Sequence, residues 1–595
     1  MRSSPRRAVS RPSTDRSAST KLWPIRLLLL AAILLAFGRA LGNDFVDWDD
    51  SGLIYNNKNL NPPTPTGLLH HWNPTNPDNI GMYDPLVYTV WWFIAHGAQL
   101  DSPDLLGAKL NPMIFHAANL AVHWLTACLV VEILLKLKLS PWPAAGGALI
   151  FAVHPIQTEA VVWATGMKDL LCGFFCMATI LAHLAGANKI GAAAKKNNLA
   201  ELALFLAALL SKPSAVVLPA IIVLLDILIL RRPLKQSVIS MIPALVLAAL
   251  AVILASALQA QGYIPLDPLW ARPFVAADAL AFYMAKLILP IDLSFDYGRS
   301  PATLLNDPTL HHALWWTWIF PAALAAILYH YRQNRRLIAA AGIFVLGLLP
   351  VLGLTKFVFQ YYSTVADRYV YLSMLGVALA AGLLIQRFSK PITAAFVAAV
   401  AVLLTSLSFA QAGVWKDSET LYRRGLALND RNLNHYVVYG QYSDREANVY
   451  LRRAQDALIN GDAEQSHYFT REAQKEIDTA IDSYRRALRI DHRTLLAYDK
   501  LTYDLILEQR TDEAISVIQQ LIDLQPNIPP RAREDPAALY YTLGMACYSA
   551  GRYPESVAAL QKSLDLKPDP AVQQHLEQAR QKMESATQPA GGPRP

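Results

Sequence analysis

Four short polar segments border or interrupt long apolar runs, and their residue types could support chemistry. The first, NDFVDWDDSG, brings Asp44, Asp47, Asp49 and Asp50 together directly after an apolar run. Neighbouring carboxylates repel each other, which raises the pKa of one of them or favours a bound cation. A carboxylate beside an acceptor hydroxyl can also act as a general base. The alternative is a solvated acidic loop that caps a helix, and the residues alone leave both open.

The second segment, HPIQTEAVVWATGMKDLL, places His154, Glu159, Lys168 and Asp169 between or at the edges of two apolar runs. A charged side chain costs roughly 2.5–3.5 kcal/mol to insert into a bilayer, so such residues tend to be paired or functional. His154 and Lys168 could bind a phosphate, and Glu159 could orient either of them. The alternative is an interfacial loop in which Lys168 and Asp169 form a local pair.

The third segment, ADRYVYL, places Asp367, Arg368 and Tyr369 at the end of another apolar run. The planar guanidinium of Arg368 suits bidentate binding of a phosphate. The alternative is an aromatic belt with a structural Asp367–Arg368 pair. The fourth segment, LILPIDLSFDYGRSP, carries Lys286, Asp292, Asp296, Tyr297 and Arg299.

The elements that must position these segments are the apolar runs. Only 17% of the residues are charged, and the chain is dominated by apolar runs up to about residue 412. A membrane-spanning helix needs roughly 20 such residues. We therefore predict about eleven spans, at approximately 23–42, 111–135, 140–155, 168–187, 198–212, 213–230, 237–258, 312–331, 337–355, 365–386 and 391–412. The run 274–291 is interrupted by Asp278, Lys286 and Pro290, and we predict that it lies at the interface without crossing.

The positions of Lys and Arg in short loops predict the orientation, because basic loops stay in the cytoplasm. The polar N-terminal segment 1–22 is basic and is predicted to be disordered and cytoplasmic. The other basic clusters follow even-numbered spans if 274–291 does not cross. This places the large loop 43–110, all four polar segments and the C-terminal part of the chain outside the cytoplasm.

The C-terminal part contains an internal repeat. The segments AIDSYRRALRIDHR from Ala480 and AISVIQQLIDLQPN from Ala514 begin 34 residues apart, which is the tetratricopeptide period. SVAALQKSLDLKPD from Ser556 follows after that period plus a short insertion. We predict a tetratricopeptide-repeat α-solenoid over 413–580, which would bind peptides or proteins on its concave face. The tail 581–595 is predicted to be disordered.

Composition disfavours a nucleic-acid partner and a framework of disulfide bonds. The net charge of +7 comes largely from the N-terminal segment and the short loops, so it does not indicate a nucleic-acid partner. Of the four cysteines, three lie in apolar runs, and their spacing predicts no disulfide framework.

These segments, in this order, give the chain a resemblance to a known family. The matching pieces are FVDWDD with Asn56–Asn57, HPIQTEAV, KDLL, LPIDLSFDY, ADRYVYL and the repeats. Together they resemble the transmembrane and tetratricopeptide-repeat O-mannosyltransferases and their bacterial relatives, which are C-type (GT-C) glycosyltransferases. The resemblance implies an all-α protein, with a polytopic GT-C-like domain over 23–412 and the repeat domain after it.

The resemblance also implies a reaction, the transfer of a sugar such as mannose from a polyprenyl-phosphate carrier to a protein Ser or Thr hydroxyl. The acidic pair of the family corresponds to Asp49 and Asp50, of which one would be the general base or both would hold a divalent cation such as Mg²⁺ or Mn²⁺. The HP-x-x-TE motif matches His154 and Glu159. The ADRY motif matches Asp367, Arg368 and Tyr369, with Arg368 placed for the lipid phosphate.

Two positions depart from the family pattern. Relatives often carry a basic residue or His before Pro-Leu in the first loop, where this chain has Asp84. Relatives often carry Arg before the Lys-Asp pair, where this chain has Met167. Each change removes a phosphate contact that the relatives could make.

The sequence thus favours a membrane glycosyltransferase, in a bacterial inner membrane, whose repeats bind the acceptor protein. The candidate catalytic residues are Asp49 and Asp50, the candidate donor-binding residues are His154, Glu159, Lys168 and Arg368, and the supporting residues are Asp169, Asp367 and Tyr369. A non-enzymatic membrane scaffold that recruits partners through its repeats is the alternative. A transporter is disfavoured because the polar residues gather on one face, whereas alternating access usually needs a site near the midplane.

Overall fold

The computed structural model describes residues 22–76, 82–103, 108–187, 191–259, 268–306, 317–388, 390–527 and 535–587. Within these ranges the chain is helical, with two isolated β-bridges and no strand, so the predicted all-α class is confirmed. The predicted disorder over 1–22 falls almost entirely outside the described residues. The predicted start of a disordered tail at 581 is wrong, because helix α26 continues to Thr587.

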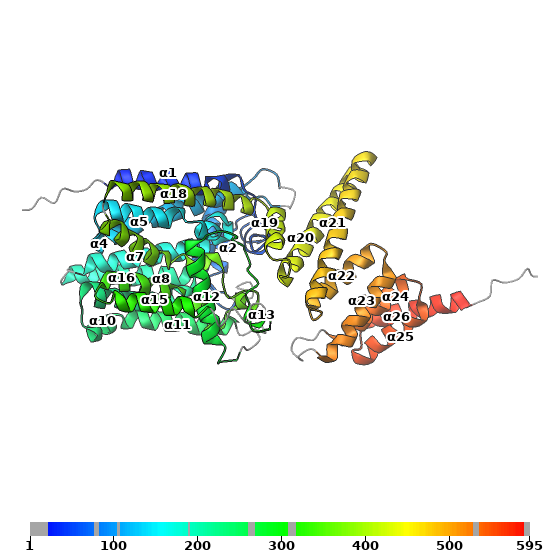
Figure 1. Ribbon diagram of the computed structural model, residues 1–595. Helices are drawn as coiled ribbons and strands as arrows, with labels where there is room; N and C mark the ends of the chain where they lie inside the picture. The colour runs from blue at the N-terminus through cyan, green and yellow to red at the C-terminus, as the bar shows by residue number, and fades with distance from the viewer. Residues whose placement is uncertain are drawn as a thin grey trace, which may run out of the picture.

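The apolar part of the chain forms a bundle, on the left in Figure 1. Its helices are α1 Trp23–Phe37, α2 Pro65–His70, α3 Pro85–Gly97, α4 Pro112–Lys136, α5 Pro141–Val153, α6 Thr158–Val162, α7 Met167–Gly186, α8 Ala192–Ser211, α9 Leu218–Leu225, α10 Leu234–Ser240, α11 Ile242–Gln259, α12 Arg272–Ile288, α13 Pro301–Asn306, α15 Ile319–His330, α16 Arg335–Leu348, α17 Met374–Arg387 and α18 Pro391–Ala412.

Several of these helices are long and apolar enough to cross a membrane, which marks the chain as a membrane protein. By length and composition, five described segments qualify, namely Trp23–Gly42, Pro112–Lys136, Ala164–Gly186, Pro213–Leu230 and Pro391–Trp415. Counting each of two bent helix pairs as one span gives up to seven. The larger predicted number, about eleven, therefore stays a prediction.

Two of the predicted spans that carry candidate site residues differ from the structure. The predicted span 140–155 is a bent pair, in which Pro141–Val153 and Pro155–Val162 meet at 51°. The predicted span 365–386 becomes an α-helix only at Met374, because residues 367–370 form a 3₁₀ turn. Both predicted spans are mostly apolar but contain polar residues. The backbone is irregular at the positions of those polar residues.

Prolines cause two of the helix ends at which candidate site residues lie. A proline disfavours the α conformation of the residue before it. His154 precedes Pro155 and is extended, with ψ at 132°, so α5 ends there. Lys212 precedes Pro213 and is also extended, with φ at −162° and ψ at 128°, so α8 ends there. The two polar side chains thus leave their helices at the points where the chain changes direction.

The predicted basic loops meet at one end of the bundle, which we call the basic end. Arg26 near the start of α1 pairs with Glu132 near the end of α4 at 2.9 Å. A guanidinium nitrogen of Arg336 donates to the carbonyl oxygen of Lys138 at 3.2 Å. The starts of α1 and α16 and the end of α4 therefore lie together.

The opposite end, which we call the site end, is marked by the first and last long helices. α1 and α18 lie side by side and run in the same direction (Figure 1). Their C-terminal ends meet, since the side-chain amide of Asn43 donates to the carbonyl oxygens of Ala412 at 3.2 Å and Trp415 at 2.9 Å. The first large loop and the C-terminal domain consequently leave the bundle at the same end.

The C-terminal domain is a series of helical hairpins, on the right in Figure 1. Its helices are α19 Ser418–Leu428, α20 Leu433–Ile459, α21 Ala463–Ile490, α22 Leu495–Leu507, α23 Thr511–Leu524, α24 Pro536–Ser549, α25 Tyr553–Leu566 and α26 Pro570–Thr587. Small residues let paired helices approach closely, since a Cβ on Gly544 would lie 2.6 Å from the Cγ of Leu560. Gly551, with φ at +73°, allows the turn between α24 and α25.

Candidate functional site

Asp50 in the first loop is fully buried and holds the loop to the bundle. Its carboxylate accepts hydrogen bonds from the backbone N–H of Val46 at 3.0 Å and of Thr165 at 3.0 Å, and from the Thr165 hydroxyl at 2.5 Å. Burial raises the pKa of Asp50 to about 7, against the effect of these hydrogen bonds, and the neighbouring charge of Asp49 raises it further. Asp50 therefore positions the loop and does not face solvent.

Asp49 differs from Asp50 because its side chain is exposed. It lies within electrostatic range of Lys168 and Arg368, whose direct partners are Asp84 and Glu159. Of the predicted acidic pair, Asp49 is thus the carboxylate that an acceptor hydroxyl can reach.

Glu159 and Arg368 form a buried ion pair that joins two of the predicted segments. The guanidinium of Arg368 contacts one carboxylate oxygen of Glu159, and the backbone N–H of Arg368 donates to the other at 2.8 Å. The guanidinium also lies over the rings of Phe359 at 4.4 Å and Tyr369 at 5.0 Å. Glu159 therefore fixes both the backbone and the charged head of Arg368, and the local Asp367–Arg368 pair is not formed.

His154 is buried, and both of its ring nitrogens are engaged by backbone groups. Nδ1 accepts from the N–H of Ile156 at 3.2 Å, so Nε2 carries the proton that is donated to the carbonyl oxygen of Leu287, also at 3.2 Å. His154 thus caps the turn that follows it and ties that turn to the end of α12. Its predicted role in donor binding stays a prediction, and it requires one of these bonds to open.

Lys168 and Asp169 do not form the local pair that the sequence allows. Lys168 pairs with Asp84 at 3.0 Å, and Asp169 pairs with Lys212 at 2.6 Å. All four side chains are largely buried. Adjacent residues of a helix point in different directions, so the two neighbours in α7 reach partners on opposite sides. The residue that departs from the family pattern, Asp84, is the one that neutralises Lys168.

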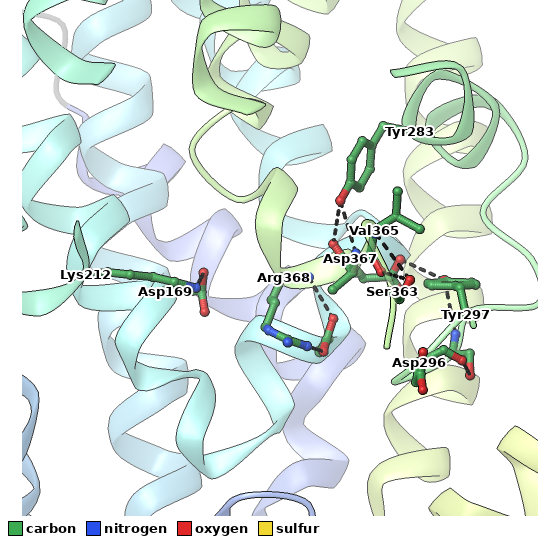
Figure 2. Close-up of polar contacts among 12 residues, drawn as sticks. Asp169, Lys212, Tyr283, Asp296, Tyr297, Ser363, Val365, Asp367 and Arg368 are labelled. Carbon is green, nitrogen blue, oxygen red and sulfur yellow. Dashed lines mark hydrogen bonds and ion pairs between the residues drawn. The ribbon is translucent and has the colours of Figure 1, made fainter. Parts of the chain in front are cut away.

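Figure 2 shows how these groups surround Arg368. Lys212 and Asp169 point toward each other on one side of it, and Asp367 lies on the other. The hydroxyl of Tyr297 donates to Asp367 at 2.8 Å. The Tyr283 hydroxyl donates to the carbonyl oxygen of Ala366 and accepts from its N–H, both at 3.1 Å, so it holds the segment before Asp367 in place.

The side chains of the fourth polar segment point to two different places, and only some of them lie near Arg368. Tyr297 contacts Asp367, whereas Asp296 turns to the repeat domain and accepts from the side-chain amide of Asn434 at 2.9 Å. The carbonyl oxygen of Asp296 also accepts from Nε2 of His435 at 3.0 Å. The segment therefore links the site to α20.

The first loop makes a second link to the repeat domain through Asp47. Its carboxylate pairs with Arg445 of α20, and its carbonyl oxygen accepts from the hydroxyl of Tyr422 at 2.7 Å. Its backbone N–H donates to the hydroxyl of Ser418 at 2.8 Å. Three residues of α19 and α20 thus hold the loop two positions before Asp49.

A narrow cavity lies at the centre of the site. Its lining consists of Asp169, Cys172, Gly173, Lys212, Ser214, Gly347, Val351, Arg368, Tyr369, Tyr371 and Leu372. One part of this lining is charged or polar and the other is apolar. Lys168 is not in the lining, because its side chain faces Asp84 and the ring of Trp91.

The predicted metal site at Asp49 and Asp50 is not supported by the geometry. Both oxygens of Asp50 already accept hydrogen bonds from protein groups. Among the described residues, no group of three or more His, Cys, Asp or Glu side chains is arranged to hold a metal ion. We derive no step through a metal.

Lys212, Thr165 and Asp84 contact the predicted site residues, although the sequence reasoning did not assign them to the site. Lys212 stands alone between two apolar runs, in SKPS. A lone lysine at that depth is costly unless it is paired, and this cost was the available signal. Thr165 gave no signal, because its contact with Asp50 spans 115 positions of the sequence.

Comparisons with known proteins bear on the repeat and on the family resemblance. Residues 537–570, which include most of α24 and all of α25, match the tetratricopeptide repeat model. The chain is similar to a Caenorhabditis elegans protein O-mannosyl-transferase, with 22% identity over 69% of this chain and 59% of that protein. It is also similar to the human protein O-mannosyl-transferase TMTC4, with 30% identity over 27% of this chain and 22% of that protein.

The human protein O-mannosyl-transferase TMTC3 is also similar, with 30% identity over 26% of this chain and 16% of that protein. The predicted resemblance to the O-mannosyltransferases is confirmed. The chain spans less than two thirds of the length of these curated relatives.

Proposed function

We propose that this chain is an integral membrane glycosyltransferase that transfers a sugar, such as mannose, from a polyprenyl-phosphate carrier to Ser or Thr hydroxyls of proteins. The observation that carries the proposal is the placement of Asp49 and Arg368. An exposed carboxylate and a buried guanidinium lie at the same end of the bundle, within electrostatic range of each other. Such a transfer needs both a base for the acceptor and a fixed positive charge for the departing phosphate.

The chemistry follows from these two roles. Asp49 takes the proton of the acceptor hydroxyl. At the same time, the oxygen of that hydroxyl forms a bond to the anomeric carbon of the sugar. The bond between that carbon and the phosphate oxygen breaks, and the carrier phosphate leaves with the bonding electrons. Arg368 stabilises the charge of the phosphate, which needs no proton to leave. Attack opposite the leaving group inverts the anomeric carbon.

The remaining site residues position these two. Asp50 fastens the loop that carries Asp49 through its bonds to Thr165. Glu159 orients Arg368, and Tyr369 packs against the guanidinium. Asp169 and Asp367 support the site from either side of Arg368, through Lys212 and Tyr297. Pre-set geometry of this kind lowers the barrier because it needs no rearrangement during the reaction.

The proposal places the site end outside the cytoplasm, in a bacterial inner membrane, with the N-terminus inside. Basic loops favour the cytoplasmic side, and they gather at the end opposite to the site. The shared direction of α1 and α18 supports the same side for the first loop and the repeats, however many spans lie between them. The repeats would then bind the acceptor protein beside Asp49.

The test uses the full chain in lipid nanodiscs, with polyprenyl-phosphate mannose as donor and a Ser/Thr-rich peptide as acceptor. We expect Asp49→Asn to lower the rate about 10²- to 10⁴-fold, the usual contribution of a general base. Asp101→Asn is the matched control, because Asp101 is an exposed carboxylate of the same loop. Equal rates for Asp49→Asn and the unchanged protein would rule out the base, and no transfer by the unchanged protein would favour a non-enzymatic scaffold.

A further inference from the structure

A row of aromatic rings leads away from the loop that carries Asp49. Trp48, the residue before Asp49, meets Phe359 edge to face, with ring centroids 6.3 Å apart. Phe359 lies 6.1 Å from Tyr362, and Tyr362 lies 5.1 Å from Tyr361. Each ring is within the range at which aromatic side chains contact each other. We call these four residues the aromatic row.

The outer half of the aromatic row is exposed. Tyr361 is 55% and Tyr362 is 39% exposed, whereas Trp48 and Phe359 are half-buried. The nearby Val358 is exposed as well, so the outer tyrosines belong to an apolar patch. Aromatic side chains gathered on a surface, unlike single exposed ones, mark a place of contact with another molecule.

The backbone that carries the two tyrosines is held against the bundle. Val358–Tyr361 is a 3₁₀ turn, and its Gln360 is buried. Just after the turn, the hydroxyl of Ser363 donates to the carbonyl oxygen of Val365 at 2.8 Å (Figure 2). The tyrosines are thus presented by a turn that is already in place, which lowers the entropy lost when a ligand binds.

The aromatic row lies between the proposed base and the repeat domain. Tyr362 is within electrostatic range of Asp49. Tyr361 is within electrostatic range of Asp491, the residue that follows α21. A polypeptide held by the repeats, with one hydroxyl at Asp49, would therefore pass the two exposed tyrosines.

The inner end of the row is in contact with the repeat domain, which argues against a belt that faces lipid. Trp48 lies 4.9 Å from Phe295. The ring of Phe295 in turn contacts Tyr422 of α19 at 5.6 Å and His435 of α20 at 4.8 Å. Aromatic belts lie at the membrane surface, whereas this row adjoins helices of the C-terminal domain.

The spacing of the rings fits an extended peptide. Successive centroids in the row are between 5.1 and 6.3 Å apart. An extended chain advances about 3.3 Å per residue, so side chains two positions apart lie roughly 6.6 Å apart on the same side. Aromatic surfaces of this kind bind proline and other apolar side chains of extended peptides.

We propose that Tyr361 and Tyr362 bind the acceptor polypeptide in an extended conformation and select proline or aliphatic side chains two and four positions from the reacting Ser or Thr. The inference rests on the proposed function, because it assigns the acceptor part of the same site. It adds to the repeats a contact on the bundle itself. That contact restricts which hydroxyls of a bound protein react.

The experiment uses the full chain in lipid nanodiscs and two labelled peptides, each with one Thr. The first has Pro two residues and Leu four residues to either side of the Thr, and the second has Gly at those positions. Fluorescence anisotropy measures binding without a sugar donor. Rates with polyprenyl-phosphate mannose then give kcat and KM for each peptide.

The informative variant is Tyr361→Ala with Tyr362→Ala. Its matched control is Tyr329→Ala with Tyr331→Ala, two exposed tyrosines that precede α16 at the basic end. Tyr361→Phe with Tyr362→Phe keeps the rings and removes only the hydroxyls. Thermal unfolding of each variant in nanodiscs and in detergent shows whether the fold is kept.

We expect the Tyr361/Tyr362 alanine variant to bind the Pro/Leu peptide about 10-fold more weakly, as for the loss of an aromatic contact in an interface. KM should rise by a similar factor while kcat stays unchanged, because the contact is equal before and during the reaction. The unchanged protein should prefer the Pro/Leu peptide to the Gly peptide about 10-fold, and the variant should bind both alike. The phenylalanine variant and the control should behave like the unchanged protein.

Unchanged affinity in the alanine variant would overturn the inference. So would a weaker variant that still prefers the Pro/Leu peptide, because the tyrosines would then act on the structure and not on those side chains. A variant with unchanged affinity whose unfolding temperature falls in nanodiscs but not in detergent would assign the row to the membrane surface.

Two further outcomes separate the inference from the proposed function. Absence of peptide binding by the unchanged protein would overturn the inference. Normal peptide binding without any sugar transfer would overturn the proposed function alone. Asp49→Asn should bind both peptides like the unchanged protein while it transfers sugar far more slowly.

Discussion

Ion pairs serve different purposes in the bundle and in the repeat domain. At the site end of the bundle, Arg368–Glu159 and Lys212–Asp169 are buried and join segments far apart in the chain. In the repeat domain, Arg486–Asp482 and Arg423–Glu419 are exposed and each lies within one helix. Exposed pairs of this kind contribute about 0–1 kcal/mol, whereas removing one partner of a buried pair costs about 3–5 kcal/mol.

The difference shows which charges specify structure. A buried carboxylate without its cation is costly, so the buried pairs allow only one arrangement of the segments that they join. The exposed pairs can break without a large penalty, and the repeat domain depends on its apolar packing instead, around residues such as Tyr484 and Leu560, both fully buried. The site is therefore sensitive to single charge changes to which the repeats should be tolerant.

The largest effect is expected from Glu159→Gln, which leaves Arg368 buried with no carboxylate. We expect a loss of about 3–5 kcal/mol in the free energy of unfolding, measured by denaturant titration of the protein in detergent micelles. The double variant Glu159→Gln with Arg368→Met should recover most of this stability but not the activity. A single variant as stable as the unchanged protein would show that the pair does not fix the segments.

An intermediate effect is expected from two neighbouring carboxyl groups in the repeats, the half-buried Asp444 and the buried Asp504. Burial, with the charge of Asp444, raises the pKa of Asp504 to about 8. The folded state then binds a proton that the unfolded state releases above about pH 4. Stability from this proton is fully present below about pH 4 and is lost progressively as the pH rises from there to about 8.

The measurement is hydrogen exchange of α20 and α22, corrected for the intrinsic rate, between about pH 5 and about pH 9. Protection should fall with rising pH in the unchanged protein. In Asp504→Asn it should stay level, because an amide does not titrate. A fall of the same size in both proteins would assign the pH dependence to another group.

The smallest effect is expected from Arg486→Ala, which removes an exposed pair between positions four apart in α21. Such pairs contribute about 0.3–0.5 kcal/mol, so the unfolding of the repeat domain should barely change. Salt should remove what effect there is, because exposed charges are screened. A loss comparable to that of Glu159→Gln would remove the contrast between the two regions.

The sequence predicts the fold better than it predicts the partners within the site. The period of the repeat and the length of the apolar runs are properties of local sequence. The all-α class and the tetratricopeptide hairpins could therefore be predicted from them. The polar segments around Glu159 and Arg368 were also found. Their pairing was not, because it depends on which way each helix is turned. Lys168 and Asp169 are neighbours in sequence, yet they pair with Asp84 and Lys212.

The contact between the ends of α1 and α18 has a consequence for biosynthesis. Asn43 and Asp47 leave the ribosome well before their partners Ala412, Trp415 and Tyr422, which come more than 350 residues later. The loop that carries Asp49 therefore stays incomplete until nearly the whole bundle has been inserted. A nascent chain therefore cannot complete these contacts until α18 and α19 have been synthesised.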